Sequence, residues 1–242
     1  MKGSFLFIVI FLALAVATGI YYTILPQFVR DAGPVVIMLI ALLIIIVTLI
    51  VERMLSLKKA QGREALAVYL RKVQQAVHAG DVDGAIQLSD KQRGSLAAVI
   101  GAGLRRYTEV ANLSDRKAAM DEVKQAIEEA TLLEVPILEK NLVAMSTIAS
   151  IATMVGLFGT VIGMIRAFFS LGSGGGTPDP QQLSLAISEA LINTAGGIGA
   201  AIIAIVAYNY FTTKVDGFTY MIDEASQSIV DSLARRTAAF GK

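Results

Sequence analysis

Cysteine is absent from all 242 residues of this chain, so disulfides and thiolate metal sites are excluded. Histidine occurs once, at His78 in a charged segment, where a lone histidine is expected on the surface rather than at a metal. Lysine and arginine number 21 against 20 acidic residues, which leaves no basic excess for binding nucleic acid. No catalytic constellation stands out. We therefore expect no enzyme activity, no metal and no cofactor.

Two more patterns are missing. The glycine-rich stretch at residues 172–176 is not followed by the lysine of a phosphate-binding loop. The chain also lacks an inverted repeat and a pair of Gly/Pro-broken helices, which are typical of secondary transporters. A solute permease is therefore disfavoured.

Hydrophobic residues, in contrast, make up 55% of the chain, above the roughly 45–50% of a soluble domain. They gather in four runs, at residues 5–25, 34–51, 142–171 and 183–211. A helix needs about 20 apolar residues to cross a bilayer, and each run meets or nearly meets that length. We predict an all-α integral membrane protein whose long transmembrane helices extend into a cytoplasmic helical domain.

The first run has two interpretations. Lys2, an apolar core and the small residues Ala15 and Ala17 resemble a signal peptide with its cleavage site. The apolar stretch continues past that site to Leu25. This favours a retained extra transmembrane helix with a short outer loop, over residues 1–33.

Basic residues set the orientation. Residues 52–140 carry 14 lysines and arginines, whereas the short connections 27–33 and 172–182 carry one and none. Because positive charge marks the cytoplasmic side, we expect both termini in the cytoplasm. The remaining segments are then a transmembrane helix at 34–51, a cytoplasmic helical region at 52–140, two long transmembrane helices with a short periplasmic loop at 141–212, and a cytoplasmic C-terminal helix at 213–242.

Helical spacing and turn signals divide the cytoplasmic region. Helices are predicted at residues 63–78, 85–89, 95–107 and from 114 onward. Asp81 or Asp83 is expected to cap the second of these and Ser114 the fourth, which Pro136 should kink or interrupt. The tail at residues 216–239 repeats apolar residues at helical spacing, so we expect an amphipathic continuation of the fourth span.

The fourth apolar run contains polar residues where lipid disfavours them. Glu189 and Asn193 share one helical face, and Thr194 borders it near the expected midplane. A carboxylate inside the membrane costs about 2.5–3.5 kcal/mol on insertion scales, so it should face a partner or water. Arg166 offers Glu189 an ion pair, or anchors its own helix at the interface. The interpretation that we favour is a polar lining around a lumen shared by several subunits.

Small and hydroxyl residues complete the set of candidates. The residues expected to permit close helix packing are Gly156, Gly159, Gly163, Gly196 and Ala200. The secondary candidates for lining a pore are Thr160, Ser188 and Asn193. A threonine in a membrane helix can instead bond to the carbonyl four residues earlier. One chain of four helices cannot enclose a wide channel, so we expect a closed ring of identical subunits.

Two stretches carry a resemblance to a known family. TIASIATMVGLFGTVIGMIRAF at residues 147–168 and ISEALINTAGGIGAAIIAIVAYN at 187–209 resemble the MotA/TolQ/ExbB proton-channel family, and ExbB and TolQ most of all. The elements GLFGT, EAL-x-x-T-A and YN are specific when they occur together. The resemblance is strong over residues 141–209 and one of topology over 34–140. Four spans with a large cytoplasmic middle are also similar to MotA, whose motifs match GLFGT less closely.

This resemblance implies a homo-pentamer in the bacterial inner membrane, around a dimer of a single-span partner similar to ExbD or TolR. An aspartate in the span of that partner accepts and releases protons in the family. Proton flow then drives work at the periplasm or outer membrane, with a TonB- or TolA-like protein as a further partner. The alternatives are a MotA-like flagellar or gliding stator subunit and a non-conducting membrane scaffold.

Matched residue by residue, the resemblance implies proton-path roles for Thr147, Glu189 and Thr194. The family usually has prolines where this chain has Thr153 and Ile203. Because proline is the usual cause of a helix kink, kinks at these two positions are in doubt for this chain.

Overall fold

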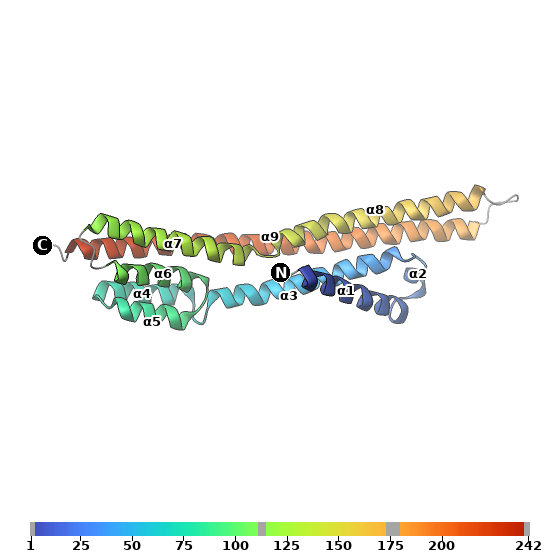
Figure 1. Cartoon of the computed structure of the whole chain (residues 1–242). Helices are drawn as coiled ribbons and strands as arrows, with labels where there is room; N and C mark the ends of the chain where they lie inside the picture. The colour runs from blue at the N-terminus through green and yellow to red at the C-terminus, as the bar shows by residue number, and fades with distance from the viewer. Residues whose placement is uncertain (1–2, 111–114, 173–179, 240–242) are drawn as a thin grey trace. The chain divides into compact units, whose positions relative to one another are not determined.

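The computed structural model describes residues 3–110, 115–172 and 180–239, and within these ranges it contains helices and no strands (Figure 1). In chain order the helices are α1 (Gly3–Thr23), α2 (Gln27–Arg30), α3 (Val35–Gln61), α4 (Leu66–Ala79), α5 (Val82–Gln92), α6 (Ser95–Glu109), α7 (Arg116–Glu139), α8 (Leu142–Gly172) and α9 (Pro180–Ala239). The all-α prediction is confirmed for these residues. The chain divides into an apolar unit, Met1–Glu52 with Asn141–Tyr210, and a polar unit, Arg53–Lys140 with Phe211–Lys242.

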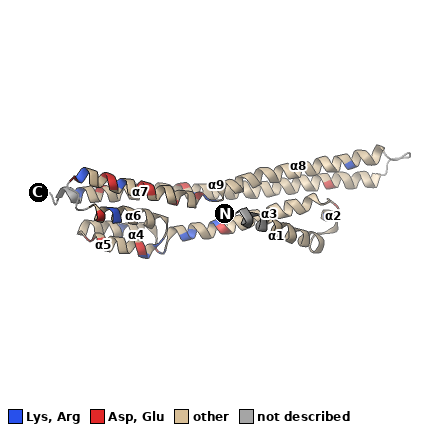
Figure 2. Cartoon of the chain, viewed as in Figure 1, with Lys and Arg blue, Asp and Glu red and all other residues tan. Residues whose placement is uncertain are grey.

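Among the residues that the structure describes, three helical stretches are long and apolar enough to cross a membrane, namely Val35–Ala79, Arg116–Gly172 and Pro180–Arg235. They contain the second, third and fourth apolar runs. Figure 2 shows α8 and the adjoining part of α9 almost free of charged residues, which instead gather on the helices of the polar unit. The first run forms α1, in which Ile10–Thr23 counts as a shorter apolar helix. Its role as an extra span stays a prediction.

Small residues bring the helices of the apolar unit together. Ala13 and Ala17 of α1 pack against Ala41 of α3, and isoleucines of α3 surround them. A second cluster joins α8 and α9 through Ala152 and Ala200, both nearly inaccessible to solvent. Most of the large apolar side chains of α8 remain exposed. This pattern suits helices surrounded by lipid or by other chains, because the contacts within the chain use mainly small residues and leave most of the large apolar side chains of α8 outside.

The polar unit follows the helical period closely. In α4, Tyr69, Val73 and Val77 recur at every fourth position and are all buried. Asp81 caps α5 by accepting a 2.8 Å hydrogen bond from the backbone N–H of Gly84, in agreement with one of the two expected caps. In the tail, the predicted apolar positions are likewise buried, and they are Phe218, Ile222, Ala225, Ile229 and Leu233.

Two helix ends differ from the expectation. The N-cap of α7 is Asp115, whose carboxylate accepts from the N–H groups of Lys117 and Ala118, while Ser114 lies outside the described residues. Pro136 does not interrupt α7, which continues to Glu139. The last carbonyls of a helix need donors from outside it. One of them, that of Leu138, accepts a 3.2 Å hydrogen bond from the buried Arg53.

Burial of Tyr69 generates a pH prediction. Its hydroxyl lies 2.8 Å from Ser89 Oγ, and burial raises the pKa of Tyr69 to about 12, with nearby Asp90 adding to the shift and the Ser89 bond opposing it. The linked stability is therefore complete below pH ~10 and is lost as pH rises toward ~12, a difference of roughly 2–3 kcal/mol. Phenolate absorbance of the wild type minus that of Tyr69→Phe should titrate near pH 12. A midpoint near 10 would contradict this burial.

Candidate functional site

The helices α8 and α9 approach each other almost backbone to backbone. A Cβ added at Gly156 would lie 3.0 Å from the Cα of Gly197, and one added at Gly163 would lie 2.9 Å from the Cβ of Ala190. Gly159 faces the side chain of Asn193 just as tightly. Real Cβ atoms are rarely found at 3.0 Å and essentially never at shorter distances, so glycine is strongly favoured at this contact. The three glycines that the sequence predicts for packing in α8 all lie there.

On the α9 side, the glycine at this contact is Gly197 rather than the predicted Gly196. Neighbouring residues on a helix point about 100° apart. An added Cβ at Gly196 would instead approach Leu39 of α3, at 3.2 Å. Ala200, also predicted for packing, is buried beside Ala152 of α8.

Arg166 and Glu189 form an ion pair across the two helices. One guanidinium nitrogen, Nη1, donates to both carboxylate oxygens, at 2.6 and 2.7 Å. The Glu189 side chain is only 6% exposed, whereas that of Arg166 is 51% exposed. The ion pair, which is the alternative in the sequence analysis, is therefore formed. The Glu189 carboxylate has its cation within the chain, which differs from the favoured interpretation of a polar lining around a lumen.

A turn from the N-terminal region lies over this ion pair. Gly33, between α2 and α3, has a φ of +81°, and a Cβ added to it would lie 2.5 Å from Glu189 Oε1. The preceding residue, Ala32, is fully buried and accepts a 2.9 Å hydrogen bond from Asn193 Nδ2. Positive φ suits glycine because it has no Cβ. The turn thus seals both polar side chains of α9 from one side.

Asn193 is fully buried, with its amide between Ala32 and the surface of Gly159. Its Oδ1 has no hydrogen-bond partner among the residues that the structure describes. A side chain enclosed in this way cannot line a lumen without movement of the turn. Asn193 therefore differs from its expected place, because the 32–33 turn occupies the space that the sequence pattern left open.

Two threonine hydroxyls meet further along the same contact. Thr160 of α8 and Thr194 of α9 are hydrogen-bonded to each other, and both also approach the Gly156 carbonyl oxygen, at 3.2 and 3.5 Å. Both residues are half-buried. Three hydrogen bonds share only two hydroxyl protons, so the bonds in this triangle cannot all be filled at once.

The other hydroxyl candidates lie apart from this pair. Thr147 donates to the Val143 carbonyl of its own helix, at 2.8 Å. It is thirteen residues from Thr160, which is about 20 Å along α8. Ser188 is exposed on α9. The structure therefore brings Thr194 to Thr160, a secondary candidate, and not to Thr147.

The threonine pair borders an apolar surface. Thr160 lies at the edge of a hollow of about 490 Å³ on the exposed face of α8. The other residues that line it are Val161, Met164, Ile165, Phe168 and Phe169. The Thr160 hydroxyl, which lines this otherwise apolar hollow, can form a hydrogen bond with a polar group on an apolar helix that packs against this face of α8.

The roles of Ala32, Gly33 and Gly197 are hard to predict from the amino-acid pattern alone. The Gly33-Pro34 pair is a turn signal, but nothing in it indicates which side chains the turn will cover. Gly196 and Gly197 are adjacent, and the sequence alone does not show which of the two faces α8, because this depends on the rotation of α9 about its axis.

Comparisons with known proteins show what the chain is similar to. Residues 91–224 match the family model described as the MotA/TolQ/ExbB proton channel family. The Tol-Pal system protein TolQ of Haemophilus influenzae is 38% identical over 109 residues, which are 45% of this chain and 46% of that protein. TolQ of Pseudomonas aeruginosa is 37% identical over 124 residues, or 48% and 51% of the two chains. The biopolymer transport protein ExbB of Pseudomonas putida is 27% identical over 180 residues, or 73% and 54%. The chain thus spans about half the length of these curated relatives.

The turn at Gly33 can be tested by adding one methyl group. Gly33→Ala should lower the stability of the chain by roughly 1–3 kcal/mol, because alanine disfavours this φ and its methyl presses on the Glu189 carboxylate. Thermal unfolding of the full chain in detergent, followed by circular dichroism, measures the loss. Gly19→Ala is the matched control, since an added Cβ there meets nothing within 4 Å. Equal melting of the two variants would argue against the turn.

The ion pair predicts a coupled response. Arg166→Gln leaves the buried Glu189 carboxylate without its cation and should cost up to about 3 kcal/mol. Adding Glu189→Gln to that variant should restore part of the loss, since the buried charge is then gone. A double-mutant cycle on thermal stability measures the coupling. Strictly additive effects would show that the two side chains do not interact.

Proposed function

Because this chain belongs to the MotA/TolQ/ExbB proton channel family, we propose that it is an ExbB/TolQ-like stator subunit of a proton-driven motor in the bacterial inner membrane. It couples proton motive force to work at the periplasm or outer membrane, such as TonB-dependent import or envelope maintenance. Five copies surround a dimer of a single-span, ExbD/TolR-like protein that carries a membrane aspartate. A TonB- or TolA-like protein receives the work, and both termini of the chain are cytoplasmic.

The Thr160–Thr194 pair is the observation that carries this proposal. Its two hydroxyls and the Gly156 carbonyl offer more acceptor positions than they have protons. Each hydroxyl can therefore switch its hydrogen-bond acceptor while the two helices stay in contact. A carboxyl group on a neighbouring helix can then find a donor or an acceptor, whichever protonation state it is in. Burial favours the neutral carboxyl and water or hydroxyls favour the charged one, so such a pair can hold the carrier at the point of exchange.

The Arg166–Glu189 pair has a supporting role in this proposal. It neutralises a carboxylate that hydrocarbon would otherwise penalise and ties α8 to α9 near the threonines. Proton exchange then falls to the hydroxyls and to the aspartate of the partner. Arg166 is half exposed, which leaves its remaining N–H groups free to contact water or lipid phosphate at the interface.

A single hydroxyl substitution tests the role of the pair. Thr194→Val keeps the shape of the side chain and removes its hydroxyl, so coupling should be abolished while assembly persists. Proton flux into liposomes that contain the chain and its single-span partner measures coupling, and chemical crosslinking measures assembly. Thr153→Val is the matched control, because the Thr153 hydroxyl bonds, among the described residues, only to the Ala149 carbonyl of its own helix. Flux at the wild-type level in Thr194→Val would contradict the assignment.

The same liposomes separate the alternatives. A non-conducting scaffold would carry no protons with or without the partner. A MotA-like stator would conduct, but with a flagellar or gliding partner in place of an ExbD/TolR-like one. A short neighbouring reading frame with one N-terminal span bearing an aspartate would support the ExbB/TolQ-like assignment.

A further inference from the structure

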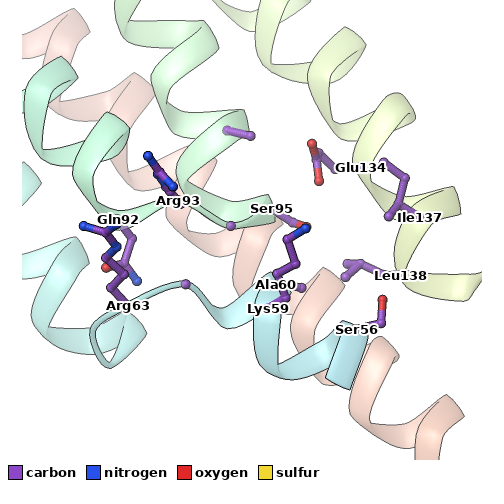
Figure 3. Close-up of a pocket in the computed structure, with 13 residues that line it drawn as sticks. Ser56, Lys59, Ala60, Arg63, Gln92, Arg93, Ser95, Glu134, Ile137 and Leu138 are labelled. Carbon is purple, nitrogen blue, oxygen red and sulfur yellow. The ribbon is translucent and has the colours of Figure 1, made fainter. Parts of the chain in front are cut away.

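The polar unit contains a cavity of about 570 Å³, lined by residues of α3, α6 and α7, by the last residue of α5 and by two connecting loops (Figure 3). The loops are tied together, since the Arg63 N–H donates to the Gln92 carbonyl at 3.0 Å. The buried Gln92 side chain also donates to the carbonyls of Gln61 and Glu64, at 3.0 and 2.8 Å. Gly94, with a φ of +119°, lets the second loop approach the first closely. The walls of the cavity are therefore held in place by hydrogen bonds.

The lining of this cavity carries a net positive charge. Its three cations are Lys59, Arg63 and Arg93, and its one carboxylate is Glu134. None of these four groups has an ion-pair partner within the described ranges of the chain. Elsewhere in the polar unit cations do find partners, as Lys72 does with Glu64 at 2.6 Å. An excess of unpaired cations around a fixed cavity favours an anionic ligand.

A hydroxyl on the cavity wall suits the same kind of ligand. Ser95 lines the cavity, is only 4% exposed as a whole residue, and has no side-chain hydrogen bond to any residue that the structure describes. Its hydroxyl keeps some accessible surface and can donate its proton to a ligand in the cavity. Ser95 also begins α6, whose N-cap, Gly94, supplies no side-chain cap. The first N–H groups of that helix are therefore open to an anion as well.

We propose that this cavity binds a phosphate-bearing anion. Phosphate oxygens accept bidentate hydrogen bonds from arginine, a charge contact from Lys59 and a hydrogen bond from the Ser95 hydroxyl. Two sources supply this chemistry, an anionic phospholipid such as phosphatidylglycerol and free phosphate.

Lipid binding to the full chain tests the site. Native mass spectrometry in a neutral detergent would compare phosphatidylglycerol, phosphatidylcholine and inorganic phosphate. We expect phosphatidylglycerol to bind with saturation and the Lys59→Gln/Arg63→Gln variant to bind it at least about tenfold more weakly. Ser95→Ala, which removes no charge, should weaken it by a smaller factor. Lys58→Gln is the matched control, because Lys58 precedes Lys59 but does not line the cavity.

Each outcome decides the matter. Loss of inorganic phosphate binding in the same two variants would also support the cavity and would identify the free anion as its ligand. Equal lipid binding by the wild type and Lys59→Gln/Arg63→Gln would overturn the proposal. So would an equal loss in Lys58→Gln, since that would reflect general surface charge. Circular dichroism of each variant confirms that it is folded, and none of these readings depends on proton conduction.

Discussion

The polar site depends on the contact between the α8 and α9 backbones at Gly156 and Gly197. Because the two helices are antiparallel and touch at this point, a residue a few positions after Gly156 faces a residue about as many positions before Gly197. Thr160 and Thr194 meet about one turn away from that contact, and Arg166 reaches Glu189 between one and two turns beyond the two threonines. The hydroxyl pair and the ion pair are thus consequences of one close approach. A larger residue at the contact would displace both together.

The N-terminal part of the chain contributes more to this site than its distance in sequence indicates. Ala32 and Gly33 lie far outside residues 91–224, where the family model matches, yet they contact Asn193 and Glu189. An amide and a carboxylate within an apolar helix pair need local partners. Here the Ala32 carbonyl accepts a hydrogen bond from the Asn193 amide, and Gly33, which has no Cβ, leaves room for the Glu189 carboxylate. The site is therefore built from the matched helices and from a segment outside the match.

Much of the helical fold was predictable, whereas the site was predictable only in part. Apolar positions at every third or fourth residue located α4 and the tail of α9, because burial of one face leaves that period in the sequence. Glu189 stood out because a carboxylate in an apolar run needs a partner. The sequence could not tell the ion pair from a lumen, Thr160 from Thr147, or Gly197 from Gly196. Each of these choices depends on which residues face the neighbouring helix. A shift of one residue along a helix turns the direction of the side chain by about 100°.

The last helix, α9, is long and continuous, and its C-terminal part is packed into a hydrophobic core. Its 60 residues, from Pro180 to Ala239, form one helix of about 90 Å with no proline after the first position. Any spin of the segment of α9 that bears Phe218, Ile222 and Leu233 would pull these side chains out of the core that encloses them. Hydrophobic packing therefore resists torque on this segment, which would suit a stationary role in the proposed motor.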